Sequence, residues 1–224
     1  MPLCSRRATV QIGAMGSLSK VLAPAAEARL FDGILNAERF FMNQAPVQQA
    51  LTKIAALLEQ AGIPYALVGA MALNEHGYER VTTDVDLLLT TEGLAEFKQR
   101  HSGRGYADKF PGSRGFRDTE HGVQIDVVIA GEFPGDGKPK PVAFPDPAAV
   151  ALRGPRLRVL PLARLLELKL ASGMTAPHRL RDLADVLEVI RVRNLPQEFG
   201  DQLAPFVRDK YRELWAAAQG RDLE

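Results

Sequence analysis

The stretch RVTTDVDLLLT, residues 80–90, places two carboxylates, Asp84 and Asp86, one residue apart at the start of an apolar run. Such a run is typical of a buried strand, and burying a carboxylate is costly unless a positive charge compensates it. The pair therefore either lies at a solvated strand end or holds a cation.

A third carboxylate lies in VQIDVVIA, residues 123–130, which is also predicted to be a strand. Alternate side chains of a strand point to the same face, so Asp84 and Asp86 project together, and Asp126 projects away from Ile125 and Val127. If the two strands are neighbours, three carboxylates converge. Asp126 alone has the simpler reading of a partner for a nearby arginine.

Three converging carboxylates repel one another and stay partly protonated unless a divalent cation holds them ionised. Oxygen ligands favour Mg²⁺ or Mn²⁺ over zinc. Two such ions can bind the attacking and leaving oxygens of a phosphoryl transfer. The pattern thus indicates phosphate chemistry.

The residues before the aspartate pair predict a strand, a tight turn and a helix. YALVG (65–69) is a short apolar run, and AMALNEHG (70–77) is a helix that ends at Gly77. Gly69 permits close approach of a ligand, and the free N–H groups after Gly69 and Ala70 favour an anion such as a triphosphate.

The remaining pattern predicts an α+β protein with a small mixed sheet, followed by a helical part. Helices are expected at 47–61, 91–100, 162–173, 178–193 and about 196–219, a loop or irregular hairpin at 101–122, and a Pro- and Gly-rich mobile loop at 131–147. We predict a poorly defined segment at 1–30, a core at 31–147 and a helical part at 148–224.

Composition excludes few functions. The formal net charge is +1, which argues against a protein that neutralises phosphates over its whole surface. A single cysteine, Cys4, excludes an internal disulfide and a cysteine-based zinc site, and the four histidines show no metal spacing. Without a long apolar stretch or a secretory signal, we expect a cytoplasmic protein with no membrane partner.

Charge is distributed unevenly. Residues 150–193 contain nine Arg or Lys against four acids, which indicates an anion-facing wall or simply a solvated face. A second group of basic residues could extend this surface toward an acceptor: Lys98, Arg100, Arg104, Lys109, Arg114 and Arg117.

The segment LVGAMALNEHGYERVTTDVDLLL (67–89) resembles the core motif of the polymerase-β-type nucleotidyltransferase superfamily. That motif combines a Gly-Ser or Gly-Gly helix start, an aspartate pair and a third strand aspartate. With LELKLASG (166–173) and RLRDLADV (179–186), it is most similar to the small bacterial AbiEii-like branch of abortive-infection and toxin–antitoxin proteins. The similarity spans residues 65–190.

The resemblance implies a role for each matching position. Asp84, Asp86 and Asp126 would bind Mg²⁺ or Mn²⁺, with Asp126 also a candidate base, and Lys169 would neutralise phosphate. Ala70 replaces the usual Ser or second Gly and removes a hydroxyl contact. Lys169 can also be read as the polar face of its helix, and Arg181 with Asp185 as a surface pair. The implied nucleotide-binding residues are Gly69, Ala70, Thr83, Arg181 and Asp185.

The implied activity is metal-dependent transfer of a nucleoside monophosphate from a nucleoside triphosphate to an acceptor hydroxyl of RNA, such as tRNA, or of a partner protein. One alternative is an antibiotic nucleotidyltransferase, and another is a degenerate binding module without catalysis, which Ala70 would permit. A manganese-dependent glycosyltransferase or a haloacid-dehalogenase-type phosphatase explains Asp126 less well. The sequence does not predict the oligomeric state.

Overall fold

The computed structural model describes residues 40, 42, 45–154 and 157–220. The segment predicted at 1–30 lies outside these residues. The described elements, in chain order, are α2 (Pro46–Ala61), β1 (Ala66–Val68), α3 (Gly69–Glu75), β2 (Asp84–Leu89), α4 (Thr91–His101), β3 (Tyr106–Asp108), β4 (Phe116–Asp118), β5 (Gln124–Ile129), α5 (Pro147–Val150), β6 (Leu152–Arg153), β7 (Arg158–Val159), α6 (Leu162–Thr175), a 3-10 turn (Pro177–Arg179), α7 (Leu180–Val192), a second 3-10 segment (Gln197–Gln202) and α8 (Pro205–Gln219).

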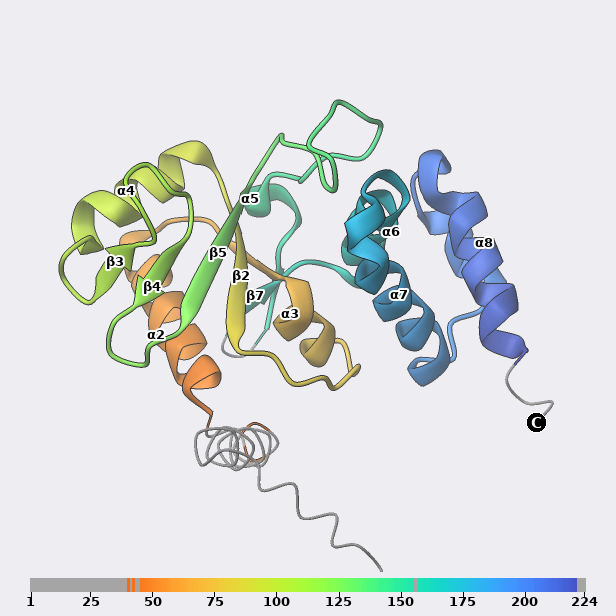
Figure 1. Ribbon diagram of the computed structural model, residues 1–224, viewed down its shortest axis with the longest axis horizontal. Coiled ribbons are helices and arrows are strands. Elements are labelled where there is room, and N and C mark those ends of the chain that lie inside the picture. Colours follow the sequence, from red (N-terminus) through yellow and green to blue (C-terminus); the bar gives the residue numbers. More distant parts are fainter. Residues whose placement is uncertain (1–39, 41, 43–44, 155–156, 221–224) are drawn as a thin grey trace, which may run out of the picture. The chain divides into compact units, whose positions relative to one another are not determined.

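The strands form one mixed sheet in the order β3-β4-β5-β2-β1-β7-β6. The β2–β5 and β1–β7 pairs are parallel, and the remaining pairs are antiparallel. The predicted fold class, a small mixed sheet flanked by helices and followed by a helical part, is confirmed (Figure 1). Strands β6 and β7 were not predicted, because two-residue strands have no readable alternation.

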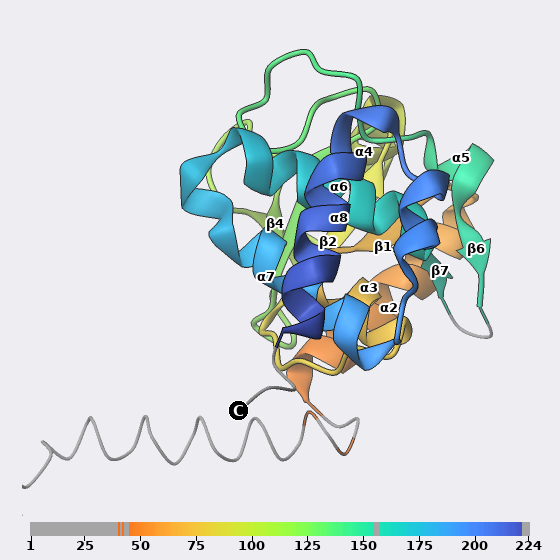
Figure 2. The same cartoon turned by 90° about the vertical axis from the view of Figure 1, so that its right-hand side faces the viewer.

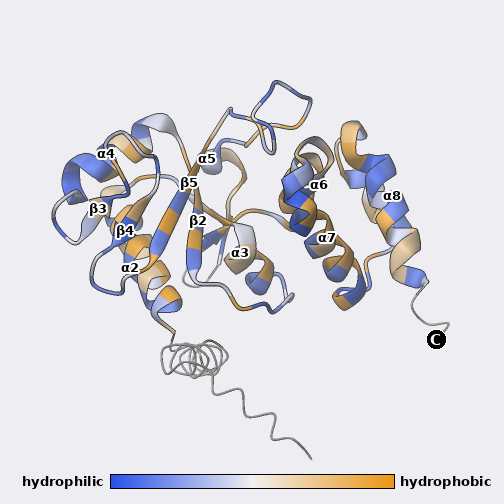
Figure 3. Cartoon of the chain, in the orientation of Figure 1, coloured by the Kyte–Doolittle hydropathy of each residue, from blue (hydrophilic) through white to orange (hydrophobic). Residues whose placement is uncertain are grey.

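The core forms where the sheet meets its helices. Helix α2 packs on β2, and its inward positions include the fully buried Ile54 and Leu58. Strand β2 contributes Val85 and Leu87 on the face opposite the two aspartates, and both are fully buried. Figure 3 shows both hydrophobic and hydrophilic residues along β2 and β5. This mixture is expected for strands in which buried apolar side chains alternate with polar ones.

Helices α6, α7 and α8 pack against one another on the side of the sheet away from α2 and α4 (Figures 1 and 2). Buried Glu167 of α6 accepts a hydrogen bond from the backbone N–H of Ala204, 2.7 Å away, just before α8 begins. Helix α3 lies between the sheet and α6 and contacts both. None of the described helices has the length and apolar character needed to cross a membrane.

The segment 131–147 contains no regular structure before α5, as predicted, and hydrogen bonds within it fold it back on itself. Lys140 Nζ donates to the Pro134 carbonyl at 2.7 Å and to Asp136 Oδ1 at 2.6 Å. Gly135 has a positive φ of 75°, and a Cβ there would lie 2.4 Å from Thr175 Oγ1 of α6. Glycine thus allows this loop to contact the helical part closely.

Candidate active site

A cleft of about 680 Å³ opens between the sheet and the helical part. One wall is formed by the start of α3 and by β2 and β5, and the opposite wall by α6, the 3-10 turn and α7. Polar residues that line it include Arg80, Asp84, Asp86, Lys109, Arg114, Asp126, Lys169, Ser172, His178, Arg179, Arg181, Asp182 and Asp185.

Three carboxylates converge on the sheet side of the cleft. Strands β2 and β5 are parallel neighbours, and Asp86 pairs in register with Asp126. Asp84 precedes Asp86 by two positions, so its side chain projects from the same face. One oxygen of each carboxylate lies within 4.8 Å of the others. The adjacency predicted from side-chain alternation is therefore present in the structure.

Gly69 brings α3 against this carboxylate cluster. Its φ is 64°, and a Cβ at this position would lie only 1.9 Å from Asp86 Oδ2. Any other residue would therefore collide with the carboxylate and adopt an unfavourable backbone conformation. Gly69 and the buried Ala70 both line the cleft.

Burial raises the pKa of Asp86 to about 6, with a further contribution from the negative charges of Asp84 and Asp126. The positive charges of Lys169 and Arg179 act in the opposite direction. The nearby positive charges thus do not fully compensate the negative charge of the cluster at neutral pH.

The donor set fits a hard divalent cation. Three carboxylates offer only oxygen ligands, and they lie close enough to share one ion. Mg²⁺ and Mn²⁺ match such ligands. Asp84 also accepts a hydrogen bond from Thr82 Oγ1, which fixes the orientation of its carboxylate.

Asp126 is partly exposed and is paired with a lysine. Lys109 Nζ lies 2.5 Å from Asp126 Oδ1, and both side chains are partly exposed. The simpler reading of Asp126, an arginine partner, is thus wrong in its residue type. Gly115 lies beneath the pair, and a Cβ there would be 2.8 Å from Asp126 Oδ1.

On the helical side, Lys169 is held by two carboxylates. Its Nζ lies 2.9 Å from Asp182 Oδ1 and 2.8 Å from Asp185 Oδ2. Ser172 Oγ donates to the second oxygen of Asp182 at 2.7 Å. Lys169 is itself buried, so the reading of this lysine as an exposed polar face is wrong. Its charge is largely compensated by these two neighbours.

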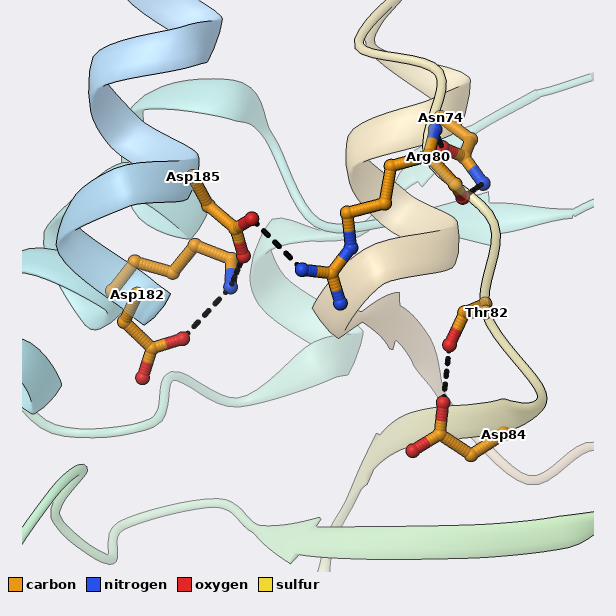
Figure 4. Close-up of polar contacts among 7 residues, drawn as sticks. Asn74, Arg80, Thr82, Asp84, Asp182 and Asp185 are labelled. Atoms are coloured by element: carbon orange, nitrogen blue, oxygen red, sulfur yellow. Dashed lines mark hydrogen bonds and ion pairs between the residues drawn. The ribbon is translucent and has the colours of Figure 1, made fainter. Parts of the chain in front are cut away.

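Asp185 also links the helical part to the core. Its Oδ1 lies 2.9 Å from Arg80 Nη1, and Arg80 belongs to the loop between α3 and β2 (Figure 4). Asp185 is buried and bound by Lys169 and Arg80, so the reading of an ordinary Arg181–Asp185 surface pair is wrong. Arg181 lines the cleft and has no ion pair with any described residue.

Thr83 does not line the cleft. It is exposed, whereas the neighbouring Thr82 bonds to Asp84. Sequence reasoning also missed Arg80 and Asp182. The only available signal was their place in the quoted motifs, because Arg80 meets Asp185 across 105 positions and Asp182 meets Lys169 only through the packing of α7 on α6. Of the six basic residues predicted to extend the surface, four pair with carboxylates: Lys98 with Asp108, Arg100 with Glu96, Lys109 with Asp126 and Arg114 with Glu132.

A second acidic group lies on the β4 side of the sheet, outside the cleft. Asp118, Glu120 and His121 offer ligand atoms within 4.8 Å of one another. Lys53 of α2 already occupies this position, 2.7 Å from Asp118 Oδ1 and 2.8 Å from Glu120 Oε2. This group therefore has a cation supplied by the chain itself.

No protein-family model matches the chain, and no curated protein matches it. Among solved structures, a crystal structure of ANT(2″)-Ia in complex with adenylyl-2″-tobramycin is similar at 14% identity and a TM-score of 0.46, covering 78% of this chain and 97% of that one. An antigenic nucleotidyltransferase-like protein from Paracoccidioides brasiliensis is similar at 16% identity and a TM-score of 0.44, covering 76% and 91%. At this identity, the chemistry of the cleft has to be judged from its own side chains.

Proposed function

We propose that this protein is a divalent-metal-dependent nucleotidyltransferase that transfers a nucleoside monophosphate from a nucleoside triphosphate to an acceptor hydroxyl. The main support is the convergence of Asp84, Asp86 and Asp126 on one point of a cleft lined by Gly69. A bound cation would compensate the like charges that raise the pKa of Asp86, and the cleft next to the cluster has room for a nucleotide.

In the proposed reaction, an acceptor oxygen forms a bond to the α-phosphorus, the bond from that phosphorus to the bridging oxygen breaks, and pyrophosphate leaves with the electron pair. Asp126, which is partly exposed, would take the acceptor proton. Divalent ions bound by the cluster would stabilise the charge on the attacking and leaving oxygens. Arg179 and Arg181 on the opposite wall add positive charge near the phosphates.

For the acceptor, we propose an RNA end or a hydroxyl of a partner protein, in keeping with the motif resemblance to the AbiEii-like branch and its toxin–antitoxin systems. A polycationic antibiotic is less favoured by the cleft. Apart from the three converging aspartates, its acids Asp182 and Asp185 are already bound to Lys169, so they offer little to ammonium groups.

The test is incubation of the purified protein with Mg²⁺, each α-³²P-labelled nucleoside triphosphate, and either total RNA or cell lysate. We expect label on a macromolecule with the wild type, a loss of about 1,000-fold or more for Asp84→Asn, and unchanged transfer for the control Glu120→Gln. Calorimetry with Mg²⁺ and each triphosphate separates the enzyme from a degenerate binding module, which should show no metal-dependent nucleotide affinity. Equal labelling by wild type and Asp84→Asn would reject the proposal.

A further inference from the structure

Arg80 is fixed at the boundary between the core and the helical part. Asn74 binds both sides of its backbone: the Arg80 N–H donates to Asn74 Oδ1 at 2.7 Å, and Asn74 Nδ2 donates to the Arg80 carbonyl at 3.1 Å. At the other end, Arg80 Nη1 donates to Asp185 Oδ1 at 2.9 Å (Figure 4). The guanidinium is therefore held from both ends beside the cleft that it lines.

One edge of this guanidinium is unused. Nε is buried and has no hydrogen-bond partner among the described residues, and Nη2 makes none there either. A buried N–H without an acceptor is unfavourable, because it has lost its hydrogen bond to water. Arg158 shows how the same edge is normally satisfied, because its Nε and Nη2 donate to the two oxygens of Glu59 at 2.6 and 3.1 Å. No carboxylate of the described residues binds this edge of Arg80.

Among the other arginines and lysines of the cleft, Lys109, Arg114 and Lys169 are bound by carboxylates, whereas Arg179 and Arg181 form no ion pair with a described residue. Lys169 is held by Asp182 and Asp185, and Lys109 is paired with Asp126. Arg80 shares Asp185 with Lys169 and uses one of its five N–H groups there. It lines the same cleft as Asp84 and Asp86, so a ligand seated between these groups meets carboxylates on one side and a guanidinium edge on the other.

We infer that Arg80 binds phosphate oxygens of the nucleotide through its Nε–Nη2 edge, with Asp185 and Asn74 as the residues that position it. This inference rests on the proposed function and assigns a ligand to a residue that the motif comparison left without a role. The planar fork of a guanidinium matches two oxygens of one phosphate, which an ammonium cannot do.

The test measures binding of Mg²⁺ with non-hydrolysable α,β-methylene triphosphates and with the corresponding monophosphates by calorimetry. For Arg80→Met we expect triphosphate affinity to fall about 10- to 100-fold, with a smaller loss for the monophosphate. Arg80→Lys keeps the charge but loses the fork, so it should recover only part of the loss. Unchanged triphosphate affinity in Arg80→Met, while Asp84→Asn loses it, would overturn the inference.

Arg193→Met is the matched control. Arg193 also joins the two parts with one hydrogen bond, from Nη1 to the His76 carbonyl at 2.9 Å, but it does not line the cleft. Its triphosphate affinity should stay within about twofold of the wild type, because only a contact between the parts is lost. An equal loss in both variants would assign Arg80 to holding the parts together and would contradict phosphate binding.

A metal-free arm separates this inference from the proposed function. Inorganic tripolyphosphate should raise the unfolding temperature of the wild type and of Arg193→Met, and raise that of Arg80→Met much less. If the wild type binds no Mg²⁺-nucleotide but shows this pattern, the proposed function fails and Arg80 remains an anion-binding residue. No rise in the wild type, or an equal rise in Arg80→Met, overturns the inference whatever the nucleotide result.

Discussion

Two acidic groups in the described part of the chain have the size of a metal site, and they differ in how their charge is compensated. At Asp118, Glu120 and His121, the ammonium of Lys53 lies within 2.8 Å of two carboxylates. At Asp84, Asp86 and Asp126, Lys109 pairs with Asp126 alone, and no lysine or arginine in the described part of the chain forms an ion pair with Asp86.

The pKa values follow this difference. Burial acts to raise the pKa of Asp118, but the hydrogen bonds from Lys53 and His121 outweigh it and hold the pKa below its usual value. Burial and like charge instead raise the pKa of Asp86 to about 6. A group of acids close together is therefore a structural feature when the chain supplies its cation, and a candidate ligand site when it does not.

The largest expected difference between the two groups is in metal binding. Asp86→Asn should weaken Mn²⁺ binding by more than about 100-fold, because a central ligand charge is lost. Glu120→Gln should leave it unchanged, since Lys53 already occupies that group. Titration of Mn²⁺ by electron paramagnetic resonance measures both variants. Loss of Mn²⁺ binding in Glu120→Gln alone would reverse the assignment of the two groups.

The next largest effect is on stability and concerns the second group. Lys53→Met should lower the free energy of unfolding by about 2–4 kcal/mol, because the fully buried Asp118 loses its main partner. Lys210→Met is the matched control: Lys210 is equally exposed at 26%, but its partner Glu213 is 64% exposed. Its cost should stay below about 1 kcal/mol. Equal costs in urea unfolding would show that the burial of Asp118 is unimportant.

The pH dependence of stability tests the first group. The pKa of Asp86 is about 6 in the folded protein, against 3.8 as its ordinary value, so the folded state holds more protons between these pH values. The free energy of unfolding of the protein therefore falls as pH rises from about 4 to 6, and this decrease is complete above that range.

Without divalent ions at pH 7.5, Asp86→Asn should be more stable than the wild type by about 1–3 kcal/mol, since it has no charge to bury. The difference should vanish near pH 3.5, where the wild-type carboxyl is protonated, and shrink at pH 7.5 when Mg²⁺ is added. Urea unfolding at the two pH values measures it. If Asp86→Asn is less stable than the wild type at pH 7.5, the ionised Asp86 carboxylate does not destabilise the folded state.

Much of this architecture could be predicted from the sequence because it depends on local periodicity. Strand alternation alone predicted that Asp84, Asp86 and Asp126 project together if their strands are neighbours, and the register of β2 and β5 places them there. The turn at Gly69 could be predicted from its place between an apolar run and a helix. Its contact with Asp86 explains why this position needs glycine.

The contacts that could not be predicted join residues far apart in the chain. Arg80 meets Asp185 across 105 positions, and Lys53 meets Asp118 across 65. No periodic pattern specifies such pairs, which depend on how α7 packs on the core and how α2 crosses the sheet. Lys169 was expected to be available to phosphate. The packing of α7 on α6, which the sequence pattern does not specify, instead brings Asp182 and Asp185 to its ammonium.

The smallest expected effect on stability belongs to Lys109. Its pair with Asp126 lies at the cleft, with side chains 30% and 43% exposed, so Lys109→Met should cost less than about 1 kcal/mol of unfolding free energy. Removing this lysine also releases Asp126 from a competing cation, so Mn²⁺ affinity should rise a few-fold. Lys53→Met has the opposite signature, a large loss of stability with no change in Mn²⁺ binding at the cleft. If Lys109→Met instead weakens Mn²⁺ binding, Lys109 assists the ligands rather than competing with the metal, and the two lysines compensate their carboxylates in the same way.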